Sequence, residues 1–311
     1  MAGGTLSTRL ARATIRASHC VPRFRPRPAY SSLPPHAPPA AKFRFEFDDS
    51  SNFIENFPDL DIPALVQNRY VLDFGSGYGG RTAWLSQWAR EVTGIEIVDA
   101  KVRAAVECTQ GRWPRCRFSL GRESEICAAA DWYDVIVSFD VLEHVERPDL
   151  IVSEWYRVLR PGGVALIIFT PYEGAFAHHL NYISLAPGLH WLFRPDTLMT
   201  AVRQLVEGPL RSATDVPNIM PAHTSYLGER VLPTLNGLTK RRFEDLVHGS
   251  GFEIEQMTSR PLLEKWRVAG QVGAAVNRAL CRVPGLDARL AHNLTAVLRK
   301  RARLGTPSGG R

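Results

Sequence analysis

The fold of this chain is decided by the stretch Val71-Leu72-Asp73-Phe74-Gly75-Ser76-Gly77-Tyr78-Gly79-Gly80-Arg81. A short apolar run ends in an acidic residue, glycines follow at alternate positions, and an amphipathic segment comes next. This order predicts a strand, a tight glycine turn and a helix. Glycines allow an unusual backbone and close approach of a ligand, and the start of a helix offers free N–H groups. We therefore expect a nucleotide-like ligand at this turn.

Two cofactor patterns fit the turn. Gly75, Gly77 and Gly80 satisfy G-x-G-x-x-G, the dinucleotide pattern. Asp73 with Gly75, Gly77 and Gly79 satisfies D/E-x-G-x-G-x-G. A carboxylate suits a cofactor that carries an ammonium and a sulfonium better than it suits a pyrophosphate. Here the chain resembles the Rossmann-like, S-adenosylmethionine-dependent methyltransferases. An NAD-dependent oxidoreductase, or a glycine-rich connector that binds nothing, is the alternative.

Further apolar runs follow in the order that this family requires. The expected strands after the first are Val92–Ile97, Cys116–Gly121, Asp134–Ser138, Val164–Phe169, Phe252–Met257 and Leu294–Leu298. A helix over residues 238–247, capped by Thr239, precedes the sixth strand. The resemblance implies an α/β fold with a Rossmann-like, doubly wound, seven-stranded sheet. That sheet is mostly parallel, its strand seven is antiparallel, and helical insertions are added to it.

The cofactor residues should lie where parallel strands end, because such a sheet opens its ligand site at that edge. Glu96, at the end of strand two, can accept hydrogen bonds from both ribose hydroxyls, or it is an ordinary solvated acid. Glu123 follows strand three, where the family usually contacts adenine. The resemblance implies that S-adenosyl-L-methionine is bound by Asp73, Gly75, Ser76, Gly77, Glu96, Ile97, Glu123 and Phe139.

The phrase VLEHV at residues 141–145, followed by VLRPGG at residues 158–163, is the second family marker. It resembles the small-molecule branch, including the ubiquinone-biosynthesis O-methyltransferases, and the resemblance covers residues 68–170 well. His144 is the candidate catalytic residue, or a helix-start residue bonded to the backbone. Asp140, Glu143 and His144 match the E-x-x-E-H arrangement that binds a divalent cation in some of those enzymes. Because Asp140 stands where that arrangement has Glu, we expect no metal.

The chemical class of the methyl acceptor can be predicted by excluding classes whose motifs are missing. Enzymes that methylate the amino groups of bases or of glutamine carry N/D-P-P-Y/F after strand four, and here that place reads Ser138-Phe139-Asp140-Val141. No RNA-binding module precedes the domain. We therefore expect methylation of a small-molecule or lipid-like acceptor at oxygen, with no nucleic-acid partner. A catalytically inactive methyltransferase-fold interaction protein is a further alternative.

Two insertions interrupt the expected domain. Residues 171–236 are too long for a simple connection and rich in aromatics and histidine, so we expect a lid over the acceptor. Its expected lining residues include Tyr172, His178, His179 and Trp191. Residues 261–290 look helical, and the basic amphipathic segment 261–283 either makes peripheral membrane contact or packs on the sheet or a second subunit. The oligomeric state is left open.

Composition sets the remaining expectations. The chain has 311 residues, 45% of them hydrophobic, which suffices for one catalytic domain over residues 46–300. Residues 1–45 contain eight Lys or Arg and no Asp or Glu, so they are a disordered basic tail or a targeting segment. Residues 301–311 form a second basic tail. Five scattered cysteines suggest reduced thiols, in a bacterial cytoplasm or, alternatively, a mitochondrial matrix.

Overall fold

The computed structural model describes residues 5–18, 33, 37–180, 183–184, 186–208, 220–261, 275–276, 279–280, 282–283 and 285–302. Its main sheet is built from β1 (Tyr70–Phe74), β2 (Glu91–Glu96), β3 (Cys116–Leu120), β4 (Tyr133–Phe139), β5 (Leu159–Phe169), β8 (Phe252–Pro261) and β9 (Ala291–Lys300). A small hairpin pairs β6 (His223–Thr224) with β7 (Arg230–Val231). The helices are α1 (Leu6–Ser18), α2 (Pro39–Glu55), α3 (Ile62–Val66), α4 (Gly80–Leu85), α5 (Asp99–Thr109), α6 (Pro148–Val158), α7 (Leu189–Leu192), α8 (Pro195–Val206) and α9 (Lys240–Ser250).

The main sheet confirms the predicted fold class. Its seven strands run in the order β3-β2-β1-β4-β5-β9-β8, and β1 to β5 are parallel where they pair. The last strand, β9, lies between β5 and β8 and is antiparallel to both. Phe74 pairs with Ile95 of β2 and with Ser138 of β4, so these three strands end side by side. The residues that follow them therefore share one edge of the sheet.

Two apolar layers hold the sheet between helices. Alternate strand residues face opposite sides, so Leu72 packs with Trp155 of α6 and Phe243 of α9 on one face. Val71 packs on the other face, with Phe53 of α2 and Trp84 of α4. The predicted helix before β8 is confirmed as α9, whose Thr239 side chain accepts a hydrogen bond from the Arg242 N–H at 3.2 Å.

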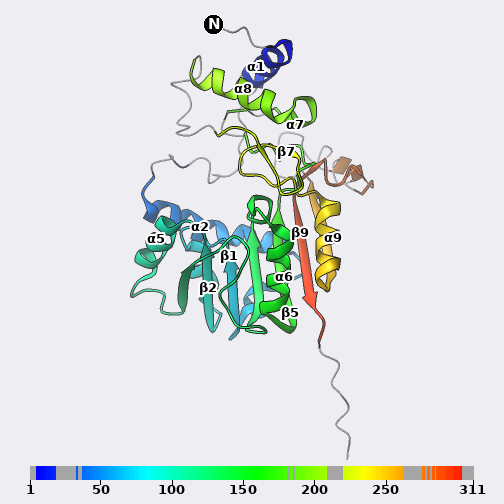
Figure 1. The fold of residues 1–311 in the computed structure, drawn as a ribbon. Helices are drawn as coiled ribbons and strands as arrows, with labels where there is room; N and C mark the ends of the chain where they lie inside the picture. Colours follow the sequence, from blue (N-terminus) through cyan, green and yellow to red (C-terminus); the bar gives the residue numbers. More distant parts are fainter. Residues whose placement is uncertain are drawn as a thin grey trace, which may run out of the picture.

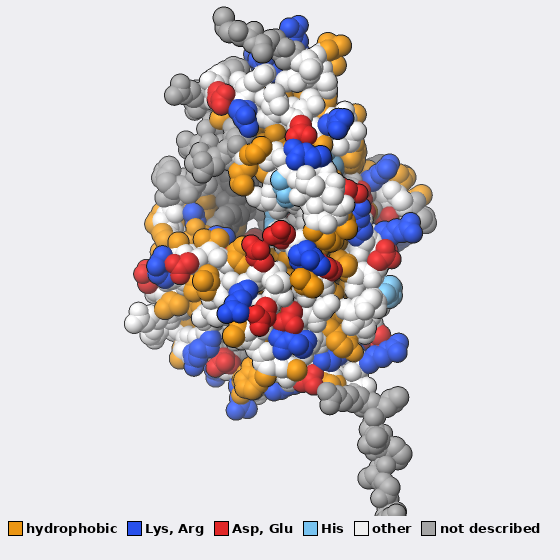
Figure 2. Space-filling view, in the orientation of Figure 1, with side chains coloured by type: hydrophobic (Ala, Val, Ile, Leu, Met, Phe, Trp, Pro, Cys, Tyr) orange, Lys and Arg blue, Asp and Glu red, His pale blue; other side chains and the backbone are white. Residues whose placement is uncertain are grey.

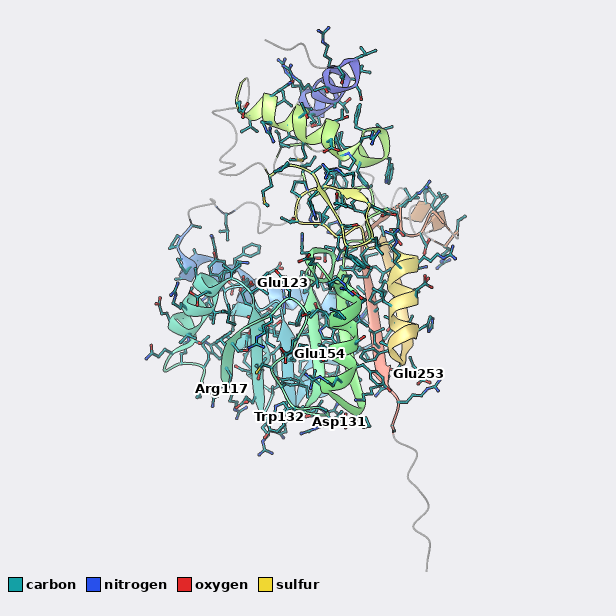
Figure 3. All side chains as sticks on the ribbon, viewed as in Figure 1. Arg117, Glu123, Asp131, Trp132, Glu154 and Glu253 are labelled. Atoms are coloured by element: carbon teal, nitrogen blue, oxygen red, sulfur yellow. The ribbon has the colours of Figure 1, made fainter. Side chains whose placement is uncertain are left out.

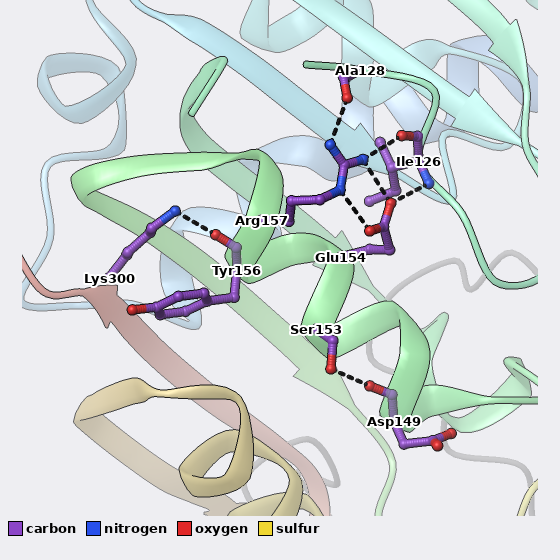
Figure 4. Close-up of polar contacts among 8 residues, drawn as sticks. All are labelled: Ile126, Ala128, Asp149, Ser153, Glu154, Tyr156, Arg157 and Lys300. Carbon is purple, nitrogen blue, oxygen red and sulfur yellow. Dashed lines mark hydrogen bonds and ion pairs between the residues drawn. The ribbon is translucent and has the colours of Figure 1, made fainter. Parts of the chain in front are cut away.

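Hydrogen bonds from the paired side chains of Arg157 and Glu154 help to fasten the connection from β3 to β4 to α6 (Figure 4). The Arg157 guanidinium donates to the carbonyl oxygens of Ile126 and Ala128, at 2.8 Å each, and to the Glu154 carboxylate. Glu154 in turn accepts the Ile126 N–H at 2.9 Å. This loop also carries Glu123, which lies at the opposite edge of the sheet from Asp131 and Trp132 (Figure 3).

The insertion after β5 is a folded subdomain with its own core. Ile183, Leu198, Val202 and Leu232 of the insertion are fully buried together with Ile15 of α1. In Figure 1, α1, α7 and α8 gather beyond one edge of the sheet, and β9 points away from them. Since β9 is antiparallel to β5, the subdomain lies at the carboxyl ends of the parallel strands.

Two parts of residues 1–45, for which a disordered tail is one of the expectations, are helical in this structure. Leu6–Ser18 is the helix α1, whose Ala11 and Ile15 are fully buried against the insertion. Residues 39–45 belong to α2, which packs on α4 and α5. Amphipathic spacing and burial explain both helices, because apolar side chains that find a partner surface are stabilised in helical form.

Two expectations fall wholly or mainly outside the described residues. Most of the amphipathic segment 261–283 is among them, as is most of the basic tail 301–311. No helix in the described part of the chain has the length and apolar character needed to cross a bilayer.

Candidate cofactor and acceptor site

The glycine turn after β1 forms as predicted and is tied to β2. The N–H groups of Gly75 and Ser76 both donate to the Ile95 carbonyl, at 2.8 and 2.9 Å. Gly75 has a φ of +82°, and a Cβ there would lie 2.2 Å from Val141. Only glycine fits this combination of left-handed backbone and close packing. The turn is thereby held against β2 on one side and the β4–α6 connection on the other.

Asp73 and Ser76 present buried polar atoms at this turn. One Asp73 oxygen accepts the Thr82 hydroxyl at 2.7 Å, and the other, Oδ1, has no partner among the described residues. The Ser76 Oγ is likewise buried without a partner there. Burial raises the pKa of Asp73, while Arg81 and Thr82 oppose that shift. Buried polar atoms need partners, so these two fit a cofactor that brings hydrogen-bond donors and positive charge.

Glu96 stands at the end of β2 as predicted and is only 7% exposed. Its Oε1 accepts the Val98 N–H at 3.0 Å, and its Oε2 lies 3.4 Å from the Lys101 Nζ. Ile97, next in the chain, is 63% exposed. An oriented carboxylate beside an open apolar side chain suits a ribose joined to a flat base. Glu123 is exposed, and among the described residues no hydrogen bond or ion pair joins it to this pair.

Phe139 ends β4 at the same edge of the sheet. The Arg81 guanidinium lies 4.3 Å from the centre of its ring, and the Phe53 ring lies 6.2 Å away. The strand ends thus bring Asp73, Gly75, Glu96 and Phe139 together, as the sequence predicted, because β1 pairs with both β2 and β4.

Sequence reasoning missed Glu46, which lies on α2 over the glycine turn. Its two carboxylate oxygens each accept the Tyr78 N–H at 3.0 Å, and Oε2 also accepts the Gly80 N–H at 3.1 Å. Burial raises the pKa of Glu46 to about 7, although these N–H groups and Arg81 lower it. The signal is weak, because the segment around Glu46 shows no motif and lies at a predicted domain boundary.

His144 lies in the short 3₁₀ turn Leu142–His144, and the end of the insertion holds that turn. The His144 Nδ1 is 2.8 Å from the Thr234 carbonyl oxygen. A carbonyl only accepts, so Nδ1 carries the hydrogen and the Nε2 of the neutral ring keeps its lone pair. The Asn236 amide donates to the carbonyls of Leu142 and Val145, at 2.8 Å each. Displacement of water by neighbouring protein atoms lowers the pKa of His144.

The insertion brings His179 next to this turn. The rings of His144 and His179 lie 5.0 Å apart, and one potential ligand atom from each, with one from Glu143, fall within 4.8 Å of one another. Burial lowers the pKa of His179 to about 3, helped by the other histidines. Burial also raises the pKa of Glu143 well above its usual range, as does Asp140. Asp140 is exposed and lies outside the group of three.

The other expected lid residues lie within the insertion itself. Both ring nitrogens of His178 are used, one by the Leu180 N–H and one by the Ala186 carbonyl, each at 3.0 Å. The Tyr172 carbonyl accepts from the His190 Nε2 at 2.9 Å, and Trp191 donates to the Glu173 carbonyl at 3.2 Å. These contacts stabilise the insertion. Of the expected lid residues, His179 is the one that groups with Glu143 and His144. Histidine and acidic side chains appear at the surface where the insertion meets the sheet (Figure 2).

Comparison with known proteins gives a family for the central part of the chain. Residues 72–167 match the family model described as a methyltransferase domain. A probable S-adenosylmethionine-dependent methyltransferase of Mycolicibacterium smegmatis is 35% identical over 120 residues, which are 39% of this chain and 41% of that protein. An arsenite methyltransferase of Mus musculus is 32% identical over 117 residues, 33% of this chain and 31% of that protein.

The likeness to solved structures concerns the fold. An S-adenosylmethionine-dependent methyltransferase from Mesorhizobium loti superposes with a TM-score of 0.51 at 14% identity, over 81% of this chain and 99% of that one. The chain spans about two fifths of the length of the M. smegmatis relative. The family match favours the methyltransferase pattern over the dinucleotide pattern at the glycine turn. Residues 72–167 are thus similar to class I S-adenosylmethionine-dependent methyltransferase domains, and this similarity supports S-adenosyl-L-methionine as the cofactor.

Proposed function

We propose that this protein transfers a methyl group from S-adenosylmethionine to a hydroxyl oxygen of a small-molecule or lipid-like acceptor. One observation supports this most: the cofactor turn and the His144 turn meet at Gly75 and Val141, beneath the folded insertion. A cofactor bound at the turn would therefore point its reactive end toward His144. The resemblance to the ubiquinone-biosynthesis enzymes supports the choice of oxygen and of a small acceptor.

The cofactor supplies a methyl group already activated on a sulfonium, so the protein has mainly to orient the acceptor and exclude water. In the transfer the S–CH₃ bond breaks, an O–CH₃ bond forms, and the hydroxyl proton must leave. His144 is a candidate base, since its Nδ1–H is held by the Thr234 carbonyl and the Nε2 of the neutral ring keeps its lone pair. The insertion would cover the acceptor, with His179 at its inner side.

Calorimetry and a methyl-transfer assay test this proposal. The protein should bind S-adenosylmethionine and S-adenosylhomocysteine but not NAD. With labelled S-adenosylmethionine and cell extract, it should label small organic-soluble products. His144→Ala should keep cofactor binding and lose turnover, while His248→Ala, an exposed histidine of α9, should keep both.

Two outcomes would contradict the proposal. If neither sulfur compound binds, the protein is an interaction module with a methyltransferase fold. If the label appears in protein or nucleic acid instead, the acceptor class is wrong.

A further inference from the structure

Glu143, His144 and His179 form a cluster with the composition of a metal site. Their potential ligand atoms lie within 4.8 Å of one another, although His179 comes from the insertion and the other two from the turn after β4. One Glu143 oxygen accepts the Thr170 N–H at 3.1 Å. The other, Oε2, is buried and has no partner among the described residues, in a side chain that is 2% exposed. An orphaned carboxylate oxygen beside two imidazoles is what a cation would satisfy.

The surroundings of the cluster fit the same interpretation. Metal-binding histidines commonly donate their second ring N–H to a backbone carbonyl, which fixes the tautomer and the ring. His144 does so through Nδ1 to Thr234. Thr234 and His179 both have left-handed backbones, with φ of +63° and +51°. Such strain in non-glycine residues concentrates at functional sites.

We propose that Glu143, His144 and His179 bind one divalent transition-metal cation. Two imidazoles and one carboxylate are ligands typical of Zn²⁺, Fe²⁺ or Co²⁺, whereas Mg²⁺ and Ca²⁺ prefer oxygen ligands. Metal–ligand bonds of about 2.0–2.2 Å hold donor atoms about 3–4 Å apart, so the side chains need to close by about 1 Å. Three protein ligands also leave coordination positions open.

The cation has a role if the proposed function is right. An acceptor hydroxyl in an open position would be more acidic, and its proton would pass to water. His144 would then act as a ligand and not as the base. The third ligand comes from the insertion, so cation binding would also hold the insertion against the cofactor domain.

Metal titration of the full chain tests the site without any methyl transfer. Protein freed of metal by a chelator should bind one Zn²⁺ per chain by calorimetry, and Co²⁺ should give a visible absorption band. His179→Ala and Glu143→Gln should each weaken Zn²⁺ binding by at least about tenfold, the smallest effect typical even of residues that only support a ligand. Circular dichroism and S-adenosylmethionine binding should show that both variants fold.

Two matched controls make the test specific to these three residues. Asp140→Asn removes a carboxylate that lies outside the cluster, and His248→Ala removes an exposed histidine far along the chain. His248→Ala should keep wild-type affinity for Zn²⁺, and Asp140→Asn, whose charge acts on Glu143, should lose less affinity than His179→Ala does. The proposal is overturned if the wild-type protein binds no Zn²⁺, or if Asp140→Asn loses the cation and His179→Ala keeps it. Zinc binding with no methyl transfer would support this site and count against the proposed function alone.

Discussion

At the scale of single residues, the site is marked by carboxylates that the protein buries without full compensation. Burial raises the pKa values of Asp73, Glu46 and Glu143, and two of these side chains keep an oxygen with no described partner. Such groups cost stability in the free protein and concentrate where a ligand will supply the missing contact. The sequence pointed to Asp73 and Glu143 but not to Glu46.

Glu46 should make the stability of the free protein depend on pH. The folded chain holds the Glu46 proton up to a pKa of about 7, while the unfolded chain releases it near 4.5. Between these values the folded state binds more protons, so the free energy of unfolding falls as the pH rises and levels off above about 7. Glu46→Gln has no carboxyl group to titrate, so its unfolding free energy should not fall with rising pH for this reason. Its unfolding free energy relative to wild type should therefore rise by up to about 3 kcal/mol from about pH 5 to about pH 8.

Chemical denaturation at the two pH values measures this difference. Asp48→Asn, an exposed residue of the same helix paired with Arg44, is the control and should show no comparable rise. A relative stability of Glu46→Gln that stays constant across this range would mean that Glu46 is not buried as described.

Glu96 should contribute directly to cofactor affinity. Glu96→Ala removes the acceptor of one or two ribose hydrogen bonds, which costs roughly 1–3 kcal/mol, or about 5- to 150-fold in affinity. Calorimetry with S-adenosylhomocysteine measures the change. Glu91→Ala, at the other end of β2, is the control and should bind normally. Equal affinity of both variants would remove Glu96 from the site.

At the scale of elements, the 3₁₀ turn Leu142–His144 depends on a segment far away in the sequence. Asn236 fastens it through bonds to Leu142 and Val145, and the Asn236 N–H donates to the Glu143 carbonyl at 2.9 Å. The turn thus owes its position to the last residues of the insertion. Residues 234–238 therefore connect the end of the insertion with the turn that carries His144.

Asn236→Ala should weaken this connection, because it removes the two hydrogen bonds of the Asn236 amide. It leaves two carbonyls without their donor, at about 1–3 kcal/mol for each one that stays buried. We expect a lower melting temperature and a large loss of turnover, with cofactor affinity nearly unchanged because the glycine turn is intact. Gln87→Ala, which removes one local bond from an exposed side chain to Trp84, is the control. Normal turnover in Asn236→Ala would show that the function of His144 does not depend on these hydrogen bonds.

At the scale of the whole molecule, α1, near the start of the chain, packs on α8 of the insertion, and the two helices belong to one subdomain. The helix α1 completes the core of the insertion, with Arg12 donating to Gln204 at 3.3 Å and the hydroxyls of Ser18 and Ser184 3.0 Å apart. In this structure the N-terminal helix is part of the folded core of the insertion. Its arginines and amphipathic spacing also resemble a targeting segment, and mutation of the buried Ile15 tests whether α1 belongs to the fold.

Ile15→Ala should destabilise the protein if α1 is part of the fold. The side chain is fully buried, and such truncations cost about 2–5 kcal/mol. Leu10→Ala, on the same helix but 53% exposed, should have little effect. Thermal denaturation of the full-length chain compares them. Equal melting temperatures for wild type and Ile15→Ala would mean that α1 contributes nothing to the folded core.

The sequence by itself determined the sheet and the cofactor edge. Apolar runs ending in Asp73 and Glu96, and the glycines between them, are local signals whose geometry follows from backbone sterics and strand alternation. The tertiary structure alone decided which distant residues meet there. Glu46 reaches the glycine turn from α2, and His179 reaches Glu143 from the insertion. No local pattern encodes such encounters, because they depend on how separate helices and loops pack to bury their apolar faces.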